Sequence, residues 1–247
     1  MGTKNQAWDL MGGRFWREGR KSAKPSTREI DLYLGQSAGG KLLVVGASTR
    51  DLIAAAIERG SDVSVADFSA VMGRDLGEEL GHGSFQFFHA DILCEPEKIS
   101  ERFDVIVADR LINRFAREDL PAFFANCHFL LNPGGELRTS VKLGFYPMDI
   151  RLIDAGRESG QVTRFYDEAT RTFNFTQARP TLETITIEHG DLPRDLLLEW
   201  YSHRGRESRF DAYDIDRALA TDLAWQEVRR EPFPDAPNTD FWIARRA

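Results

Sequence analysis

The stretch 41–69 constrains the fold more than any other part of the sequence. It opens with an unbroken apolar run at 42–45, which is typical of a strand buried on both faces of a parallel sheet. Gly46 ends this run, and apolar residues then recur at helical spacing until Gly60. A second apolar strand follows and ends at Asp67. The stretch is therefore predicted to form a strand, a turn, a helix and a second strand that carries an acid at its tip.

The same alternation of strands and helices continues along the chain and then stops. The further elements predicted before residue 143 are helices at 70–80 and 120–131 and strands at 85–88, 103–108 and 136–142. Strands that alternate with helices form a parallel sheet covered on both faces, and such sheets bind ligands at the carboxyl ends of their strands. Asp67, Asp91 and Asp109 each follow a predicted strand, so we expect a binding site there.

Two regions lie outside this alternation. Residues 1–40 are basic and aromatic, and we expect them to form a helical lid in which Trp16 and Arg20 approach the site. The domain proper is then 41–247, interrupted by an inserted α/β cap at about 144–220 that contains Tyr166. Within the cap, the pattern predicts helices at 148–156, 195–201 and 214–220, a hairpin at 161–176 and a strand at 181–187. The chain is predicted to close with a hairpin formed by 225–230 and 241–244.

Composition narrows the possible classes of function. The chain has 247 residues, a net charge of -7 and two cysteines, Cys94 and Cys127. Its acidic balance argues against nucleic acid as the main partner, and no apolar run approaches the roughly 20 residues that span a membrane. No Cys/His cluster predicts a metal site. We therefore expect a cytoplasmic monomer or homodimer that acts on a small molecule.

Five short motifs, taken in order, resemble those of the class I S-adenosylmethionine-dependent methyltransferases. VVGAST at 44–49 resembles the first motif of that family, whose backbone approaches the methionine part of the cofactor. VADFSAVM at 65–72 resembles the second motif, and HADI at 89–92 resembles the third. FDVIVADRL at 103–111 and LLNPGGEL at 130–137 resemble the fourth-strand and Pro-Gly-Gly motifs.

The resemblance implies an α/β fold with a doubly wound, mostly parallel, seven-stranded Rossmann-like sheet whose last strand is antiparallel. It also implies S-adenosylmethionine as the cofactor. Asp67 would bind the ribose hydroxyls, Phe68 would lie against the adenine, and Asp91 would accept from the adenine amino group. The complete implied cofactor-binding set is Gly46, Ala47, Ser48, Asp67, Phe68, Asp91, Ile92, Asp109 and Arg110.

The glycine turn departs from the family pattern. The family usually has Gly-x-Gly-x-Gly, but Ser48 and Arg50 replace the second and third glycines here. Arg50 or Arg110 could then pair with the methionine carboxylate. The same turn weakens an assignment to dinucleotides, although Arg50 could neutralise a phosphate and NAD therefore stays open.

We expect the acceptor to bind beside the fourth and fifth strands. The candidates for catalysis are Asp109, Asn113 and Tyr146, and those for the lid or substrate are Trp16, Arg20 and Tyr166. The commonest reaction of this fold is transfer of the sulfonium methyl group, here to a small molecule, by SN2 attack. Two alternatives stay open. One is cyclisation of the cofactor with release of methylthioadenosine, as in the azetidine-2-carboxylate synthases, and the other is binding without turnover.

Overall fold

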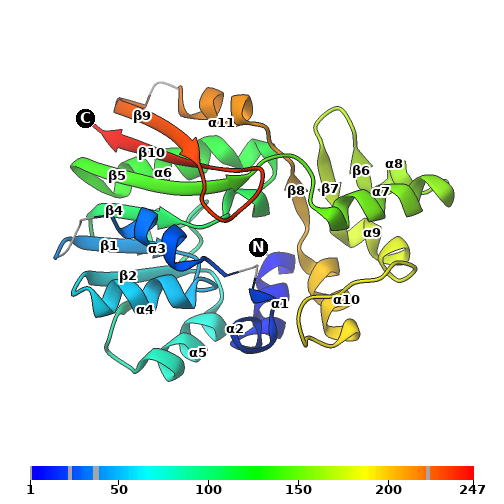
Figure 1. The fold of residues 1–247 in the computed structure, drawn as a ribbon, viewed down its shortest axis with the longest axis horizontal. Coiled ribbons are helices and arrows are strands. Elements are labelled where there is room, and N and C mark those ends of the chain that lie inside the picture. Colours follow the sequence, from blue (N-terminus) through cyan, green and yellow to red (C-terminus); the bar gives the residue numbers. More distant parts are fainter. Residues whose placement is uncertain (1, 22–23, 36–38, 221–222) are drawn as a thin grey trace.

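The computed structural model describes residues 2–21, 24–35, 39–220 and 223–247. The chain forms a larger lobe around a seven-stranded sheet and a smaller lobe that contains a three-stranded sheet (Figure 1). None of the described helices is long and apolar enough to cross a membrane.

The larger sheet has the strand order expected of a doubly wound fold. In spatial order its strands are β3 (Gln86–His89), β2 (Asp62–Asp67), β1 (Lys41–Val45), β4 (Phe103–Ala108), β5 (Leu131–Lys142), β10 (Thr239–Arg246) and β9 (Trp225–Pro232). Neighbouring strands from β3 to β5 pair in parallel, whereas β10 pairs antiparallel with both β5 and β9. The mostly parallel sheet with a reversed last strand is therefore confirmed.

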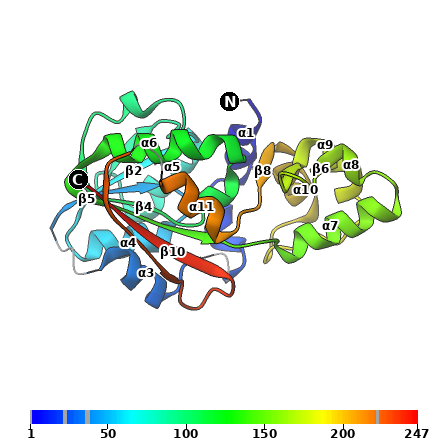
Figure 2. The same ribbon diagram turned by 90° about the horizontal axis from the view of Figure 1, so that it is seen from above.

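Helices cover both faces of this sheet. One face packs against α3 (Thr27–Leu34), α4 (Arg50–Glu58) and α5 (Ala70–Leu80). The other face packs against α6 (Leu120–Leu130) and α11 (Ala212–Leu219). Figure 2 shows α6 and α4 on opposite sides of the strands.

The two cores follow from the alternation of side chains along each strand. In β1, Leu42 and Val44 belong to the core under α4 and α5, whereas Leu43 and Val45 belong to the core under α6. All four side chains are buried, which explains why the sequence shows a continuous apolar run rather than an alternating one.

The smaller lobe, called the cap from here on, comprises residues 147–208. Its elements are α7 (Pro147–Glu158), α8 (Val162–Phe165), β6 (Tyr166–Asp167), β7 (Thr172–Asn174), α9 (Phe175–Leu182), α10 (Arg194–His203) and β8 (Arg206–Ser208). The cap sheet has the order β6-β7-β8, with antiparallel pairing throughout. The helix predicted at 214–220 corresponds to α11, which packs against α6 of the larger lobe and not within the cap.

The structure corrects the sequence prediction at two places in the cap. The strand predicted at 181–187 is wrong, because Thr181 and Leu182 complete α9, and 183–187 contains no strand. Asn174 explains the difference. Its side chain accepts a hydrogen bond from the Gln177 backbone nitrogen and so caps the start of α9, which extends to Leu182. The hairpin predicted at 161–176 exists as β6 and β7 but is shorter, because α8 precedes it and α9 follows it directly.

The two lobes are bridged by the first helices of the chain, α1 (Gly2–Met11) and α2 (Arg14–Glu18), which together are called the lid from here on. Figure 1 shows them between the lobes. Helix α1 packs against α10 of the cap and also against α5 of the larger lobe. On the larger lobe, the Ser69 hydroxyl donates a hydrogen bond of 2.6 Å to Asp9.

Candidate active site

A cavity of about 1240 Å³ lies between the carboxyl ends of the main strands, the lid and the cap. Its first end, called the strand end, is formed by residues that follow β1, β2, β3 and β4. Its second end, called the cap end, is formed by side chains of α1, α7, α10 and β8. Ligand pockets commonly measure about 300–1000 Å³. This cavity is therefore large enough for two small molecules side by side.

The turn after β1 brings backbone close to the cavity. Gly46 has a φ of 101°, and a Cβ there would meet only the Ser48 hydroxyl, 3.9 Å away. This left-handed conformation favours glycine and leaves open space in which a ligand can approach the main chain. Arg50 does not line the cavity, because its guanidinium lies 2.8 Å from Asp51 and 3.3 Å from Glu79. Arg50 is therefore not placed to pair with a ligand in the cavity.

Asp67 ends β2 and faces the cavity. Its two carboxylate oxygens accept hydrogen bonds of 2.7 Å from the backbone nitrogens of Ala47 and Ser69. These bonds fix the carboxylate beside the glycine turn. Burial raises the pKa of Asp67 to about 6, although the two backbone hydrogen bonds oppose this shift.

Asp91, Phe68 and Ile92 line the same end of the cavity. One oxygen of Asp91 accepts a hydrogen bond of 2.9 Å from the Leu93 backbone nitrogen. His89 Nε2 lies 3.0 Å from the carbonyl oxygen of Phe68 and holds that loop in place. The strand end therefore presents two carboxylates and two apolar side chains, an arrangement suited to a sugar and a flat ring.

Asp109 belongs to a buried hydrogen-bonded network at the end of β4. Its Oδ1 lies 2.9 Å from the Tyr33 hydroxyl and 3.0 Å from Ser140 Oγ, and burial raises the pKa of Tyr33 well above its usual value. Arg110 follows with a φ of 50°, which is uncommon for a residue with a side chain. Its guanidinium lies 3.0 Å from Glu29 and 3.6 Å from Asp109. Both Asp109 and Arg110 reach the cavity.

Two further predicted residues line the cavity. Tyr146 precedes α7, and the guanidinium carbons of Arg209 and Arg114 lie 5.1 Å and 5.6 Å from its ring centre. Arg20 lies just after the lid and 3.6 Å from Glu188 of the cap. Both side chains therefore sit where the lid or the cap closes over the strand ends.

Four of the predicted site residues do not line the cavity: Ala47, Trp16, Asn113 and Tyr166. The Asn113 amide forms two hydrogen bonds of 2.9 Å with the backbone of Lys142, so it holds β5 instead of facing a ligand. Tyr166 packs inside the cap with its ring centre 4.7 Å from that of Phe173.

Trp16 lies outside the cavity but contacts the backbone that borders it. Its indole Nε1 donates a hydrogen bond of 3.1 Å to the carbonyl oxygen of Ser48, in the turn after β1. The side chain is buried, and it links the lid directly to the backbone that borders the cavity.

Sequence reasoning missed the buried charges at the cap end. Glu207 contacts Arg114, Arg204 and Arg209, and Arg209 also pairs with Asp149 at 2.5 Å and 2.9 Å. Burial alone would raise the pKa of Glu207, but the three arginines outweigh burial and lower it to about 2. These side chains come from η3 (Ile112–Arg114), α7 and the segment around β8, and no sequence pattern joins those segments.

The lid and α10 supply further cavity residues that the sequence did not predict to lie at the site. They are Lys4, Asn5 and Trp8 of α1 and Trp200, Tyr201 and Arg204 around α10. The one available signal was the dense mixture of aromatic and charged residues at 200–209. Among the described residues, no group of three or more His, Cys, Asp or Glu side chains could hold a metal ion.

The chain resembles known proteins over part of its length or over all of it. A family model described as a methyltransferase domain matches residues 42–135. A solved protein from Rhodobacter sphaeroides, provisionally described as a Zn-dependent alcohol dehydrogenase, is 38% identical over the whole of both chains, with a TM-score of 0.91. A comparison with curated proteins found no match.

Two more distant structures share the fold. The 1,6-didemethyltoxoflavin-N1-methyltransferase of Burkholderia thailandensis is 16% identical, with a TM-score of 0.57 over 95% of this chain and 82% of its own. The N-methyltransferase NodS of Bradyrhizobium japonicum is 13% identical, with a TM-score of 0.51 over 89% of this chain and 84% of its own. At these identities the comparison shows the fold alone.

The strand order and the position of the cavity define a Rossmann-like methyltransferase fold. The matching model identifies residues 42–135 as a methyltransferase domain, consistent with the class I S-adenosylmethionine-dependent methyltransferases. The cofactor of that family is S-adenosylmethionine. The description of the Rhodobacter protein names zinc and a dehydrogenase activity, and both are said of that protein alone.

Proposed function

We propose that this chain transfers the methyl group of S-adenosylmethionine to a small-molecule acceptor. The observation that carries the proposal is one continuous cavity that runs from the strand end, at Asp67 and Asp91, to the cap end around Glu207. One end holds the cofactor and the other holds the acceptor. The two molecules therefore meet near the middle of the cavity, beside the residues that follow β4.

The strand end suits the cofactor in several independent ways. Asp67 is held beside the turn and can accept from the ribose hydroxyls, and Asp91 can accept from the adenine amino group. Phe68 and Ile92 border the space that a flat ring would occupy. Gly46 leaves the backbone open to the methionine part. Each of these residues would hold the cofactor without any change in the fold.

When bound, the cofactor supplies a methyl group already activated by a sulfonium, so the protein contributes mainly alignment, which is worth about 7–11 kcal/mol in well-oriented reactions. Arg110 reaches the cavity with its guanidinium fixed by Glu29 and Asp109, and we assign it to the methionine carboxylate. Asp109 accepts a hydrogen bond from the Tyr33 hydroxyl and lies 3.6 Å from the Arg110 guanidinium. We therefore assign Asp109 to the positioning of Arg110. The Tyr146 hydroxyl, 3.4 Å from Arg114, is available to orient the acceptor.

The roof over the cavity supports a small acceptor. Helix α1 and the cap cover the strand ends, and α1 packs directly against α10. Such a cover limits the access of water and of a folded macromolecule to the reacting groups. We therefore infer a small-molecule acceptor rather than a macromolecule.

Product analysis tests the reaction type. The purified protein is incubated with S-adenosylmethionine alone, and the nucleosides are separated by chromatography. We expect tight retention of the cofactor and no methylthioadenosine above the spontaneous rate, because methyl transfer needs an acceptor. Rapid release of methylthioadenosine without an acceptor would overturn methyl transfer and establish cyclisation. A protein that neither binds nor consumes the cofactor would contradict both reactions.

A further inference from the structure

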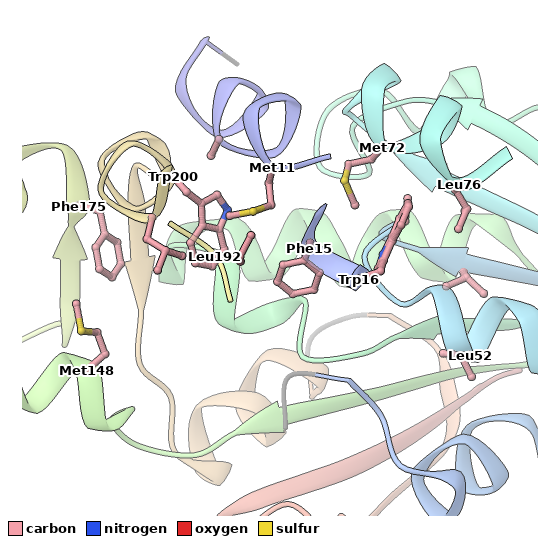
Figure 3. Packing of buried hydrophobic residues seen from close by; sticks show 14 of the residues in the cluster. Met11, Phe15, Trp16, Leu52, Met72, Leu76, Met148, Phe175, Leu192 and Trp200 are labelled. Atoms are coloured by element: carbon pink, nitrogen blue, oxygen red, sulfur yellow. The ribbon is translucent and has the colours of Figure 1, made fainter. Parts of the chain in front are cut away.

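The cap end of the cavity has an aromatic wall. The ring centre of Trp200 in α10 lies 5.7 Å from that of Trp8, 6.4 Å from that of Phe15 and 5.0 Å from that of Tyr201. All four residues line the cavity. Figure 3 shows Trp200 and Phe15 close together, with Met11 of α1 nearby, where the cap meets the lid. Rings arranged in this way offer flat apolar surfaces and edges to a ligand of the same kind.

The same wall contains buried polar atoms without partners. Trp200 is 5% exposed, and its Nε1 has no hydrogen-bond partner among the described residues. Asn5 Oδ1 and His189 Nε2 are buried and likewise lack partners within the described ranges. Burial and the nearby Arg20 and Arg204 lower the pKa of His189 to about 4, so its ring is neutral at pH 7. Buried donors and acceptors are normally paired, and all three of these side chains line the cavity.

A cluster of buried charges adjoins this wall and is not neutral. Five side chains are linked by ion pairs, namely the three arginines Arg114, Arg204 and Arg209 and the two acids Glu207 and Asp149. Their formal sum is +1. The Arg114 side chain is 24% exposed, so a ligand in the cavity that brings one negative charge can reach it and neutralise the cluster.

Arg114 is the member of the cluster best placed to bind such a charge. Its nitrogens lie 3.3 Å and 3.4 Å from the Glu207 oxygens and 3.4 Å from the Tyr146 hydroxyl. Strong arginine–carboxylate hydrogen bonds are shorter, about 2.7–2.9 Å. Arg204 joins the cluster to the aromatic wall, because its guanidinium carbon lies 5.0 Å from the Trp200 ring centre. The positive charge and the unpaired indole therefore belong to one subsite.

We propose that the acceptor is a small aromatic carboxylic acid. Its ring packs against Trp8 and Trp200, a hydrogen-bond-accepting atom receives the Trp200 Nε1–H, and its carboxylate neutralises the cluster at Arg114. The proposal rests on the methyltransferase function, since it names the molecule that shares the cavity with the cofactor. It also explains why the cap end carries both aromatic rings and an excess of positive charge.

Three matched probes separate ring shape from charge. Binding of benzoate, benzamide and cyclohexanecarboxylate to the whole protein is measured by ligand-observed NMR in the presence of saturating S-adenosylhomocysteine. Benzamide keeps the flat ring but lacks the charge, and cyclohexanecarboxylate keeps the charge but lacks the flat ring. We expect benzoate to bind at least fivefold tighter than either analogue. Equal binding of benzoate and cyclohexanecarboxylate, or no binding of benzoate, would overturn the proposal.

Variants assign the two interactions to residues. Trp200→Phe keeps a ring but removes the N–H, and we expect at least fivefold weaker binding of nicotinate, whose ring nitrogen can accept that N–H, with binding of benzoate unchanged. Trp225→Phe is the matched control, because Trp225 Nε1 is also buried and unpaired among the described residues but lies outside the cavity. Arg114→Gln should abolish the preference for benzoate over benzamide. A retained preference in Arg114→Gln would contradict the assignment of the carboxylate.

The cofactor measurement keeps this inference separate from the proposed function. Binding of S-adenosylhomocysteine to the unmodified protein is measured first by calorimetry. Normal cofactor binding without benzoate binding would remove the inference and leave the methyltransferase function in place. Absence of cofactor binding would remove the proposed function itself.

Discussion

The two ends of the cavity are built in different ways. At the strand end, the binding groups come from the consecutive stretch 46–110, and Asp67 is held by backbone nitrogens of nearby turns. At the cap end, Glu207 and Asp149 are held by arginine side chains from segments far apart in the sequence. The first end is therefore fixed by sheet topology and the second by long-range ion pairs.

The largest expected effect is on the ion pairs of the cap. Asp149→Ala leaves Arg209 buried without its closest partner, and such a loss destabilises by about 3–5 kcal/mol. Denaturant unfolding should show this decrease in the free energy of unfolding. Asp154→Ala in the same helix is the control, since Asp154 is exposed. Equal stability of the two variants would show that the cap does not depend on its buried charges.

The next largest effect concerns cofactor affinity at the strand end. Asp67→Ala removes the acceptor for the ribose hydroxyls, and we expect a loss of about 1–3 kcal/mol in the binding of S-adenosylhomocysteine. Calorimetry measures this change. Asp62→Ala is the control, because Asp62 is exposed at the opposite end of the same strand. Unchanged affinity in Asp67→Ala would remove Asp67 from the cofactor site.

The two ends should also differ in their response to pH. The pKa of Asp67 is raised to about 6, and the ribose hydroxyls require its ionised form. Affinity for S-adenosylhomocysteine should therefore be full at pH 7.5 and about tenfold lower at pH 5. The pKa of Glu207 is lowered to about 2, so the stability that it contributes is present above its unfolded pKa and is lost only as pH falls toward 2. Calorimetry from pH 5 to 8 would reject this assignment if the affinity were constant.

The smallest effect concerns the lid that spans both ends. Trp16→Phe removes the hydrogen bond to the Ser48 carbonyl and should weaken closure by about 0.5–1.5 kcal/mol. Backbone hydrogen exchange over 15–20 should be faster in this variant than in the native protein. In the native protein it should be slower with the cofactor bound than without it. Equal protection of this segment with and without ligand would show that it is a fixed part of the fold.

The sequence could predict which strand ends meet at the strand end of the cavity, because topology alone brings them together. Parallel strands place their carboxyl ends on one edge, so Gly46, Asp67 and Asp91 could be grouped before any contact was known. Asn113 shows where this reasoning stops. It follows β4 as expected, but its amide pairs with the Lys142 backbone and faces away from the cavity. Position in a loop predicts the neighbourhood of a side chain but not its direction.

The cap end could not be predicted for a different physical reason. Arg114 and Glu207 are more than 90 residues apart, and neither residue shows by its type that the two will pair. Trp200 could be recognised as a core aromatic, but its unpaired nitrogen becomes visible only when its neighbours are known. Such features depend on the packing of specific side chains, which no periodic pattern of the sequence encodes.

The bridging position of α1 has a consequence for the order of folding. Helix α1 packs against α10, and more than 180 residues separate the two in the sequence. Contacts between such distant segments form late, because closing a long loop is entropically unfavourable until both partners are structured. We therefore expect the contact between α1 and α10, which joins the two lobes at the cap end, to form after each lobe has its own core.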